Sequence, residues 1–86
     1  MKHIRLSEHA LRYEERRGFS TDEVRQAILK APWTPAEYGE GGMQCSKTFE
    51  FGQDWNGKTY KTKCVRPIFV EEETEIVVVT VYTYFY

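Results

Sequence analysis

The chain has 86 residues, of which 41% are hydrophobic and 15% aromatic, so we expect one domain, residues 1–86, with one modest core. Twelve Lys and Arg residues nearly balance thirteen Asp and Glu residues, and a net charge of -1 favours neither nucleic acid nor a membrane surface as a partner of the whole chain. No apolar run is long enough to span a bilayer, and the first ten residues lack the apolar centre of a signal peptide. We therefore expect a cytoplasmic protein without membrane association.

The charges are unevenly distributed along the chain. Residues 1–30 hold seven basic and five acidic groups, which leaves five basic and eight acidic groups for the other residues. A local basic patch matters more for binding phosphate than the total charge does. The first 30 residues are therefore where we look for such a patch.

Residues 7–19, SEHALRYEERRGF, predict a first short helix. The Ser7 hydroxyl can accept a hydrogen bond from an amide of the first turn, and Gly18 can adopt the left-handed conformation that ends a helix. Four side chains share one stripe of this helix, at the spacing i, i+3, i+4, i+7: His9, Arg12, Tyr13 and Arg16. An imidazole, a phenol and two guanidinium groups are an unusual set for a core-facing stripe, so this helix is the first candidate for a functional surface.

A second helix is predicted from Ser20, and Pro32 ends it. Ser20 and Glu23 form the S-x-x-E pattern of a capping box, in which the two side chains satisfy backbone N–H groups of the first turn. An apolar stripe at helical spacing is expected to pack on the core: Val24, Ala27, Ile28 and Ala31. The tight connection at residues 18–20 would make the two helices a helical hairpin.

Residues 31–42 predict the most mobile loop of the chain, because they contain two prolines and three glycines. Trp33 and Tyr38 lie in this loop. These aromatic residues could either pack against the core or contact a ligand, and the sequence leaves both roles open.

Alternation of apolar and polar residues begins at Met43 and predicts a strand up to residue 51. The dipeptide Asn56-Gly57 is a strong hairpin signal, and residues 58–70 are the expected return strand. Pro67 lies inside that strand, where it requires an edge, a bulge or a break because it lacks a backbone N–H.

Two cysteines would lie roughly opposite each other in this hairpin, Cys45 on the first strand and Cys64 on the second. In a cytoplasmic protein they are expected to be thiols, and two small buried residues are the simpler interpretation. A disulfide is the alternative for an oxidising compartment or a thermophile.

Residues 76–86, IVVVTVYTYFY, predict the strongest strand, and an acidic turn at residues 71–75 precedes it. Strict alternation predicts that one face carries Val77, Val79, Val81, Thr83 and Phe85. The other face would carry Ile76, Val78, Thr80, Tyr82, Tyr84 and Tyr86. Because both faces are largely apolar, we expect this strand to be central in its sheet.

The order of elements is two helices and then three or four strands. It predicts an α+β domain, in which an N-terminal helical hairpin packs on one face of a three- to four-stranded, mainly antiparallel sheet. The other face of such a sheet would be partly open and bordered by the first helix.

This border suits phosphate chemistry. A helix edge with His9, Arg12 and Arg16 would lie beside strand residues with hydroxyl and ammonium groups: Lys61, Lys63, Thr80, Tyr82 and Tyr84. Arginines bind phosphate through paired hydrogen bonds and stabilise charge that grows in a transition state. A neutral histidine near a helix N-terminus can act as a general base, and tyrosines can stack on unpaired bases.

Each of these patterns also has an ordinary structural interpretation. Arg12 follows Glu8 by four residues, a favourable spacing for an ion pair on a solvated helix face. The tyrosines suit cross-strand packing, and Lys61 and Lys63 can protect an edge strand from aggregation. The two histidines and two cysteines show no metal-ligand spacing, so we expect neither a metal nor another cofactor.

Short motifs at both ends of the chain resemble a family of small proteins known as a domain of unknown function. They are Ser7-Glu8-His9-Ala10, Arg16-Arg17-Gly18-Phe19-Ser20 and Val78-Val79-Thr80-Val81-Tyr82. The family opens with an S-x-H-A helix and an E-R-G-[IVF]-[ST] turn, and it closes on a strand similar to V-V-T-V-Y. It is grouped with RelE/ParE-like toxins and with metal-independent ribonucleases of the barnase–colicin class, and the resemblance implies a RelE/ParE-like fold.

The resemblance also implies a function, namely a toxin of a toxin–antitoxin system that acts as an endoribonuclease. The 2′-hydroxyl of RNA would attack the adjacent phosphate without help from a metal ion. The catalytic residues expected from the resemblance and the residue patterns together are His9, Arg16 and Tyr82. The expected phosphate- and RNA-binding residues are Arg12, Arg17, Lys61, Lys63, Thr80 and Tyr84.

The alternative function is a non-catalytic protein-binding module or a ParE-like inhibitor of a protein target. The near-neutral charge and the tyrosine-rich last strand favour it, because such a strand can accept a strand of a partner. The expected partners are therefore RNA and an antitoxin or other protein, and a homodimer is an open alternative.

Overall fold

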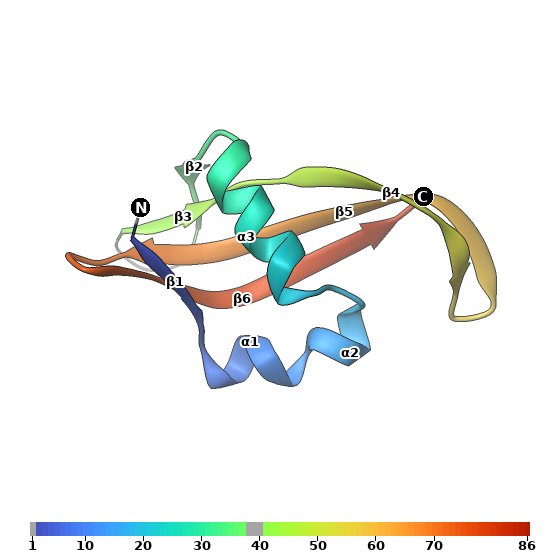
Figure 1. Cartoon of the computed structure of the whole chain (residues 1–86), viewed down its shortest axis with the longest axis horizontal. Helices are drawn as coiled ribbons and strands as arrows, with labels where there is room; N and C mark the ends of the chain where they lie inside the picture. The colour runs from blue at the N-terminus through green and yellow to red at the C-terminus, as the bar shows by residue number, and fades with distance from the viewer. Residues whose placement is uncertain (1, 38–40) are drawn as a thin grey trace.

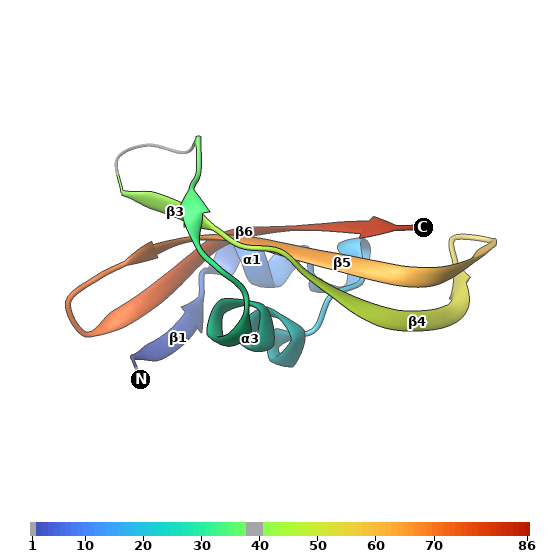
Figure 2. The same ribbon diagram turned by 90° about the horizontal axis from the view of Figure 1, so that it is seen from above.

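The chain is organised around one mixed β-sheet, in a computed structural model that describes residues 2–37 and 41–86. Within these residues the sheet has six strands, and three short helices lie on one side of it (Figures 1 and 2). The strands are β1 (His3–Leu6), β2 (Thr34–Pro35), β3 (Gly42–Gln44), β4 (Lys47–Trp55), β5 (Lys58–Glu71) and β6 (Glu75–Phe85). The helices are α1 (Glu8–Arg12), α2 (Glu14–Arg17) and α3 (Thr21–Lys30). No helix in this part of the chain is long and apolar enough to cross a membrane.

The long antiparallel pair of β5 and β6 forms the centre of the sheet. On its outer side β6 pairs in parallel with β1, and the strand order continues from β5 to β3 and β2. Strand β4 also pairs with β5, next to β3 on the same side. The predicted hairpin connection between β4 and β5 is confirmed, because Asn56 and Gly57 form a two-residue turn with φ values of 51° and 82°.

The predicted architecture is wrong. Of the described residues 52% are strand and 23% are helix, and they form a six-stranded mixed sheet and three short helices in place of a helical hairpin on three or four strands. The lead-in segment is a strand, with Ile4 and Leu6 buried and His3 and Arg5 exposed. The predicted first helix is broken at Tyr13, whose φ of -97° and ψ of 2° separate α1 from α2.

Helix α3 begins at the predicted capping box. The Ser20 hydroxyl accepts from the Glu23 backbone N–H, and the Glu23 carboxylate accepts from the Ser20 N–H. Its buried residues, Val24, Ala27 and Ile28, join one hydrophobic core with side chains of β5 and β6. Burial of these apolar groups between the helix layer and the sheet is the main stabilising contribution to the fold.

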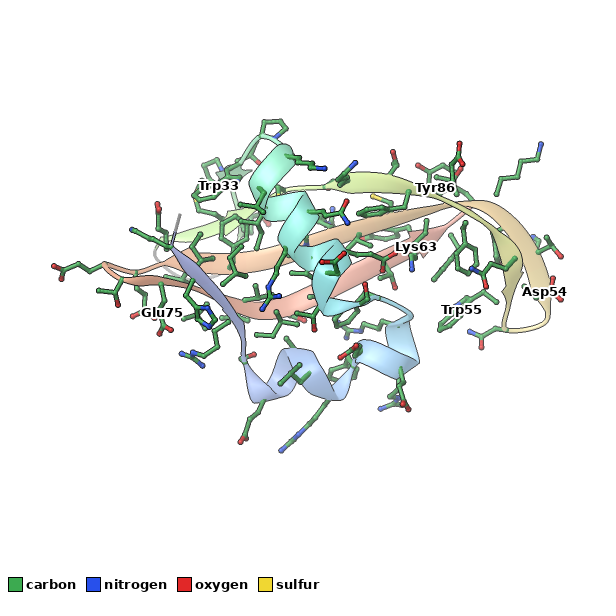
Figure 3. All side chains as sticks on the ribbon, in the orientation of Figure 1. Trp33, Asp54, Trp55, Lys63, Glu75 and Tyr86 are labelled. Atoms are coloured by element: carbon green, nitrogen blue, oxygen red, sulfur yellow. The ribbon has the colours of Figure 1, made fainter. Side chains whose placement is uncertain are left out.

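The predicted mobile loop contains the short strand β2 and the first residue of β3, and part of it packs on the core. The Trp33 indole N–H donates to the Ile28 carbonyl oxygen at 2.8 Å, and its ring meets the Phe69 ring edge-on at 4.9 Å (Figure 3). The sequence leaves two roles open for Trp33, and the structure shows that it packs against the core. Tyr38 lies outside the described residues.

A β-bulge in β6 changes which residues share a face. Phe69 pairs with Val78 and Ile68 pairs with Thr80, so Val79 has no partner on β5. The predicted faces of residues 76–86 are therefore wrong across the bulge. Strict alternation makes no allowance for an extra residue, so it groups the residues before Val79 with the wrong residues after it. The face toward the helices carries Ile76, Val78, Val81, Thr83 and Phe85.

Pro67 occupies a break in the pairing of β5, as its missing N–H requires. On the side of β5 away from β6, β3 pairs as far as Ile68 and β4 pairs from Val65. Pro67 lies between these two ladders, opposite the irregular residues 45–46. A proline is tolerated there because no neighbouring carbonyl needs its backbone hydrogen.

Candidate functional site

The face of the sheet opposite the helices, hereafter the open face, carries a group of tyrosines toward the C-terminal end of β6. The register of β5 and β6 places Arg66 opposite Tyr82 and Cys64 opposite Tyr84. Tyr86 follows on the same face, because residues of a strand alternate between faces. The three tyrosines are 38%, 43% and 62% exposed, in chain order. Aromatic surface of this extent on a strand that borders the sheet is available to a ligand.

Arg66 lies among these rings. Its guanidinium carbon is 5.5 Å from the centre of the Tyr82 ring and 5.1 Å from that of Tyr84, and it donates a hydrogen bond to the Tyr84 hydroxyl. The Nε atom of Arg66 is buried and has no hydrogen-bond partner in the described structure. The rings therefore hold the guanidinium in place through cation–π contacts, without neutralising its charge.

Arg17 reaches the same group of residues from the end of α2. Its guanidinium donates to Thr80 Oγ1 at 3.2 Å and to the Val81 carbonyl oxygen at 2.9 Å, both on the outer edge of β6. The guanidinium carbon lies 4.2 Å from the centre of the Tyr13 ring and 5.2 Å from that of Tyr82. Arg17 thus connects the helices to the open face around the edge of the sheet.

Together these residues form a continuous series of alternating aromatic and cationic side chains, which we call the Arg–Tyr row. Its members are Tyr13, Arg17, Tyr82, Arg66 and Tyr84. Arg16 extends it, with its guanidinium carbon 5.6 Å from the Tyr13 ring centre. His9 stands at the Tyr13 end of the row, with its ring centre 5.0 Å from that of Tyr13 and the planes tilted by 55°.

The arginines of this surface have no carboxylate partners. Within residues 2–37 and 41–86, ion pairs join Lys2 to Glu71, Arg5 to Glu75 and Lys63 to Glu23. Arg16, Arg17 and Arg66 take part in none of these pairs. A near-neutral chain therefore carries a local concentration of unneutralised positive charge, the quantity that matters for binding phosphate.

Lys63, predicted as an RNA-binding residue, lies on the other face of β5. Its ammonium group is 2.8 Å from the Glu23 carboxylate and donates to the Gly18 carbonyl oxygen at 3.0 Å. The residue is only 8% exposed. Lys63 and Arg66 are three residues apart on β5, so they point to opposite faces of the sheet and Lys63 lies under the helices. Its charge joins α3 to the sheet and is not available on the open face.

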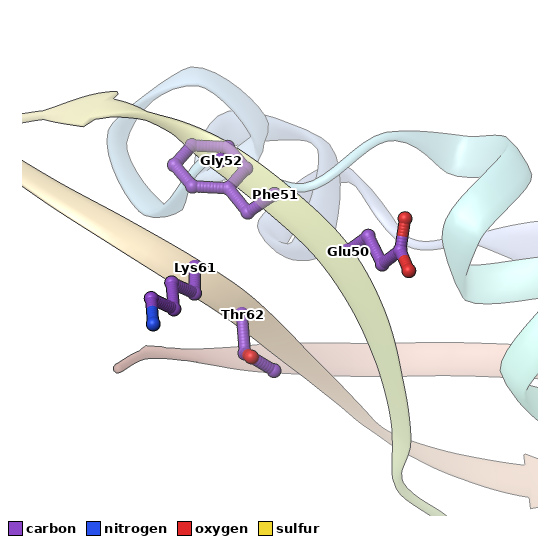
Figure 4. Close-up of a pocket in the computed structure, with 5 residues that line it drawn as sticks. All are labelled: Glu50, Phe51, Gly52, Lys61 and Thr62. Carbon is purple, nitrogen blue, oxygen red and sulfur yellow. The ribbon is translucent and has the colours of Figure 1, made fainter.

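Lys61 and Arg12, two other predicted RNA-binding residues, are also outside the row. Lys61 lines a shallow, open hollow at the bulge of β4, together with Glu50, Phe51, Gly52 and Thr62 (Figure 4). The hollow offers one carboxylate and one ammonium group, so it has no net charge that would select a ligand. Arg12 is exposed on α1 and makes no ion pair, hydrogen bond or cation–π contact with any described residue.

The cysteines have no partners that suggest chemistry. Both are free thiols, and Thr48, not Cys45, lies opposite Cys64 in the ladder. Burial raises the pKa of the Cys45 thiol to about 11, which leaves it protonated and unreactive at neutral pH. No group of three or more His, Cys, Asp or Glu side chains in the described part of the chain is arranged to hold a metal ion.

The structure thus brings six predicted residues to one surface and adds two that the sequence pattern does not assign to it. The predicted residues are Arg16, Arg17, Thr80, Tyr82 and Tyr84, with His9 at the end of the row. Arg66 was not predicted as a site residue, and Tyr13 was noted only as part of the helix stripe. A charged residue between Val65 and Pro67 in an apolar strand was the one available signal for Arg66.

Comparisons with known proteins add nothing to this geometry. No protein-family model matches the chain, and searches of curated proteins and of solved structures give no match.

Proposed function

We propose that this chain is a metal-independent endoribonuclease that binds single-stranded RNA along the Arg–Tyr row. The observation that carries the proposal is the alternation of Arg17 and Arg66, which lack carboxylate partners, with partly exposed tyrosine rings. A guanidinium group pairs with phosphate, and every base has a face that can stack on an aromatic ring. Paired bases hide these faces inside a duplex, so the row suits an unpaired strand.

His9 supplies the general base of the proposed reaction. Its neutral imidazole takes the proton of the 2′-hydroxyl as the O2′–P bond forms, and the P–O5′ bond breaks. The leaving 5′-oxygen takes a proton from solvent, and a 2′,3′-cyclic phosphate remains. Arg16 and Arg17, near the same Tyr13 ring, stabilise the negative charge that grows on the phosphate oxygens. Growth inhibition as a toxin is the biological role that follows from the resemblance.

Incubation of the purified protein with single-stranded RNA in the presence of a chelator tests this proposal. Wild type should leave 2′,3′-cyclic phosphate ends, and His9→Ala should cleave about 100-fold more slowly, the loss typical of a missing general base. His3→Ala is the matched control, because His3 is also an exposed histidine but lies on β1. Equal cleavage by His9→Ala and wild type would contradict the assigned role. Binding of RNA without cleavage by wild type would contradict the enzymatic part of the proposal.

A protein-binding module is the second candidate, and the edge of β6 favours it. Strand β1 pairs with β6 only from Glu75 to Val78, and no strand in the described residues pairs with the outer edge of Thr80–Phe85. A partner could add a strand to the part of this edge that follows Val81, whose carbonyl oxygen already accepts from Arg17. This candidate predicts a stable complex with the product of a neighbouring reading frame and no RNA cleavage, which co-purification and the cleavage assay together would show.

A further inference from the structure

We propose that the tyrosines in and directly after the last part of β6 select an extended, unstacked strand rich in pyrimidines, with one base on each of Tyr82, Tyr84 and Tyr86. This inference rests on the RNA-binding part of the proposed function and does not depend on cleavage. It names the conformation and base composition of the ligand, which charge and aromatic content alone do not define.

The spacing of the three tyrosines carries the argument. They occupy alternate positions of one strand, so neighbouring rings are attached about 6.8 Å apart along it. Bases that remain stacked in a helical strand advance only about 3.4 Å per nucleotide. Consecutive bases therefore cannot stay stacked on each other and also each occupy one tyrosine. A strand that uses all three rings must be stretched to about twice its stacked rise.

The exposed area of the rings allows this arrangement. Tyr82 and Tyr84 keep 38% and 43% of their surface exposed although the Arg66 guanidinium lies over both rings. Tyr86 is 62% exposed, and no cation lies over it among the described residues. Its backbone N–H and carbonyl oxygen pair with those of Thr62 on β5, at the end of the ladder between β5 and β6. Tyr84 and Tyr86 can therefore each receive a base directly. A base reaches the Tyr82 ring by displacing one of the two guanidinium groups that lie over it, Arg17 or Arg66.

The cations fit the phosphates of the same stretched strand. Arg66 contacts the rings of both Tyr82 and Tyr84, which places it near the phosphate that links their two bases. Arg17 contacts the ring of Tyr82 from the edge of the sheet, where the next phosphate along the strand would pass. Two phosphates neutralised in this way predict a slope of about -1.4 in a plot of log affinity against log salt concentration.

The base preference follows from the cost of stretching. A strand must lose its own stacking before its bases can occupy the rings, and purines stack on each other more strongly than pyrimidines do. Sequence preferences of single-strand binders arise from this difference in stacking and in backbone flexibility, and pyrimidine runs are a common outcome. Oligo(U) is therefore the preferred ligand, and oligo(A) is bound more weakly.

The test measures binding of 2′-O-methylated six-nucleotide RNAs, which lack the attacking hydroxyl and cannot be cleaved. Fluorescence anisotropy at several salt concentrations should show that U6 binds at least threefold tighter than A6, with the predicted salt slope for wild type. The Arg66→Gln variant should lose one phosphate contact and give a slope of about -0.7. Equal or tighter binding of A6 would overturn the inference and leave the proposed function standing. Failure of both oligonucleotides to bind would overturn both.

Ring variants separate stacking from charge. Tyr84→Leu should weaken U6 binding about tenfold, within the range found for removal of one stacking aromatic, while Tyr84→Phe keeps the ring and should stay within threefold of wild type. Tyr86→Leu should also weaken U6 binding and should not change the binding of a two-nucleotide competitor. Retention of wild-type affinity in both leucine variants would overturn the assignment of one base to each tyrosine.

Discussion

Two cations on the same strand show the difference between the two faces of the sheet. Lys63 and Arg66 are three residues apart on β5 and point to opposite faces. Under the helices, Lys63 is paired with Glu23 at 2.8 Å and with the Gly18 carbonyl oxygen (Figure 3). On the open face, Arg66 has tyrosine rings around it and no carboxylate. The covered face neutralises its charge within the chain, and the open face leaves its charge for a ligand.

The two environments have different energetic consequences. A largely buried ion pair is costly to break, because the remaining partner is left charged and unpaired in a medium of low polarity. Lys63 is therefore a structural residue. Arg66 keeps its charge beside exposed aromatic surface, where loss of the side chain removes no ion pair. We expect it to affect binding far more than stability.

The largest expected effect on stability comes from Lys63→Met, which keeps the apolar stem and removes the charge. The free energy of unfolding should fall by about 3 kcal/mol, the lower end of the range for a broken buried pair, since Glu23 retains some solvent contact. Urea unfolding measures this change. The double variant Lys63→Met with Glu23→Gln should recover part of the loss, because no unpaired charge remains. A loss below about 1 kcal/mol in Lys63→Met would show that the pair has no structural role.

Gly18→Ala should have the next largest effect, because two costs add at this position. Gly18 has φ of 72°, and a Cβ there would lie 2.6 Å from a ring carbon of Trp55. The left-handed conformation costs alanine about 1 kcal/mol, and displacement of Trp55 adds about as much again. Gly57→Ala is the matched control, with φ of 82° and no atom within 4 Å of its Cβ.

Urea unfolding and tryptophan fluorescence compare the two glycine variants. Gly57→Ala should lose only the conformational cost of about 1 kcal/mol, and Gly18→Ala should also change the emission of Trp55. Equal losses in the two variants would show that Trp55 does not support the turn between α2 and α3.

The smallest effect is the pH dependence from an exposed pair at the other end of β6. The hydrogen bond from Arg5 lowers the pKa of Glu75 below its ordinary value. A carboxylate with a lowered pKa contributes stability above its unfolded-state pKa of about 4.3, and this contribution is lost as the pH falls through the folded-state value. Acid titration of unfolding for wild type and Arg5→Met should show a slightly steeper loss of stability below pH 4.3 in wild type. Identical profiles would mean that the exposed pair contributes nothing.

Parts of the fold governed by local chemistry were predictable from the sequence. The capping box at Ser20 and Glu23, the turn at Asn56-Gly57 and the break at Pro67 each depend on the conformational limits of one or two residues. The sheet was not predictable in the same way. Strand β1 has only four residues, and its place beside β6 depends on contacts about 70 residues away in the sequence. Two- and three-residue strands such as β2 and β3 leave no periodic pattern at all.

The candidate site was predicted only in part, and the bulge at Val79 explains why. At the turn between β5 and β6, Glu71 lies opposite Ile76, and an unbroken ladder would then place Arg66 opposite Val81. The extra residue shifts the partner of Arg66 to Tyr82. No local sequence pattern marks this bulge, because Val79 stands in a run of valines. The contact between Arg66 and the tyrosines therefore depends on a tertiary feature.

The most direct measurement of the central claim compares RNA affinity and stability in the two cation variants of β5. Binding of 2′-O-methylated U6 at low salt and urea unfolding are measured for wild type, Arg66→Gln and Lys63→Met. The account predicts that Arg66→Gln loses about tenfold in affinity, as expected for loss of a charged phosphate contact, with little change in unfolding, while Lys63→Met loses stability and keeps its affinity. Wild-type affinity in Arg66→Gln, or loss of affinity only in Lys63→Met, would contradict the assignment of RNA binding to the open face.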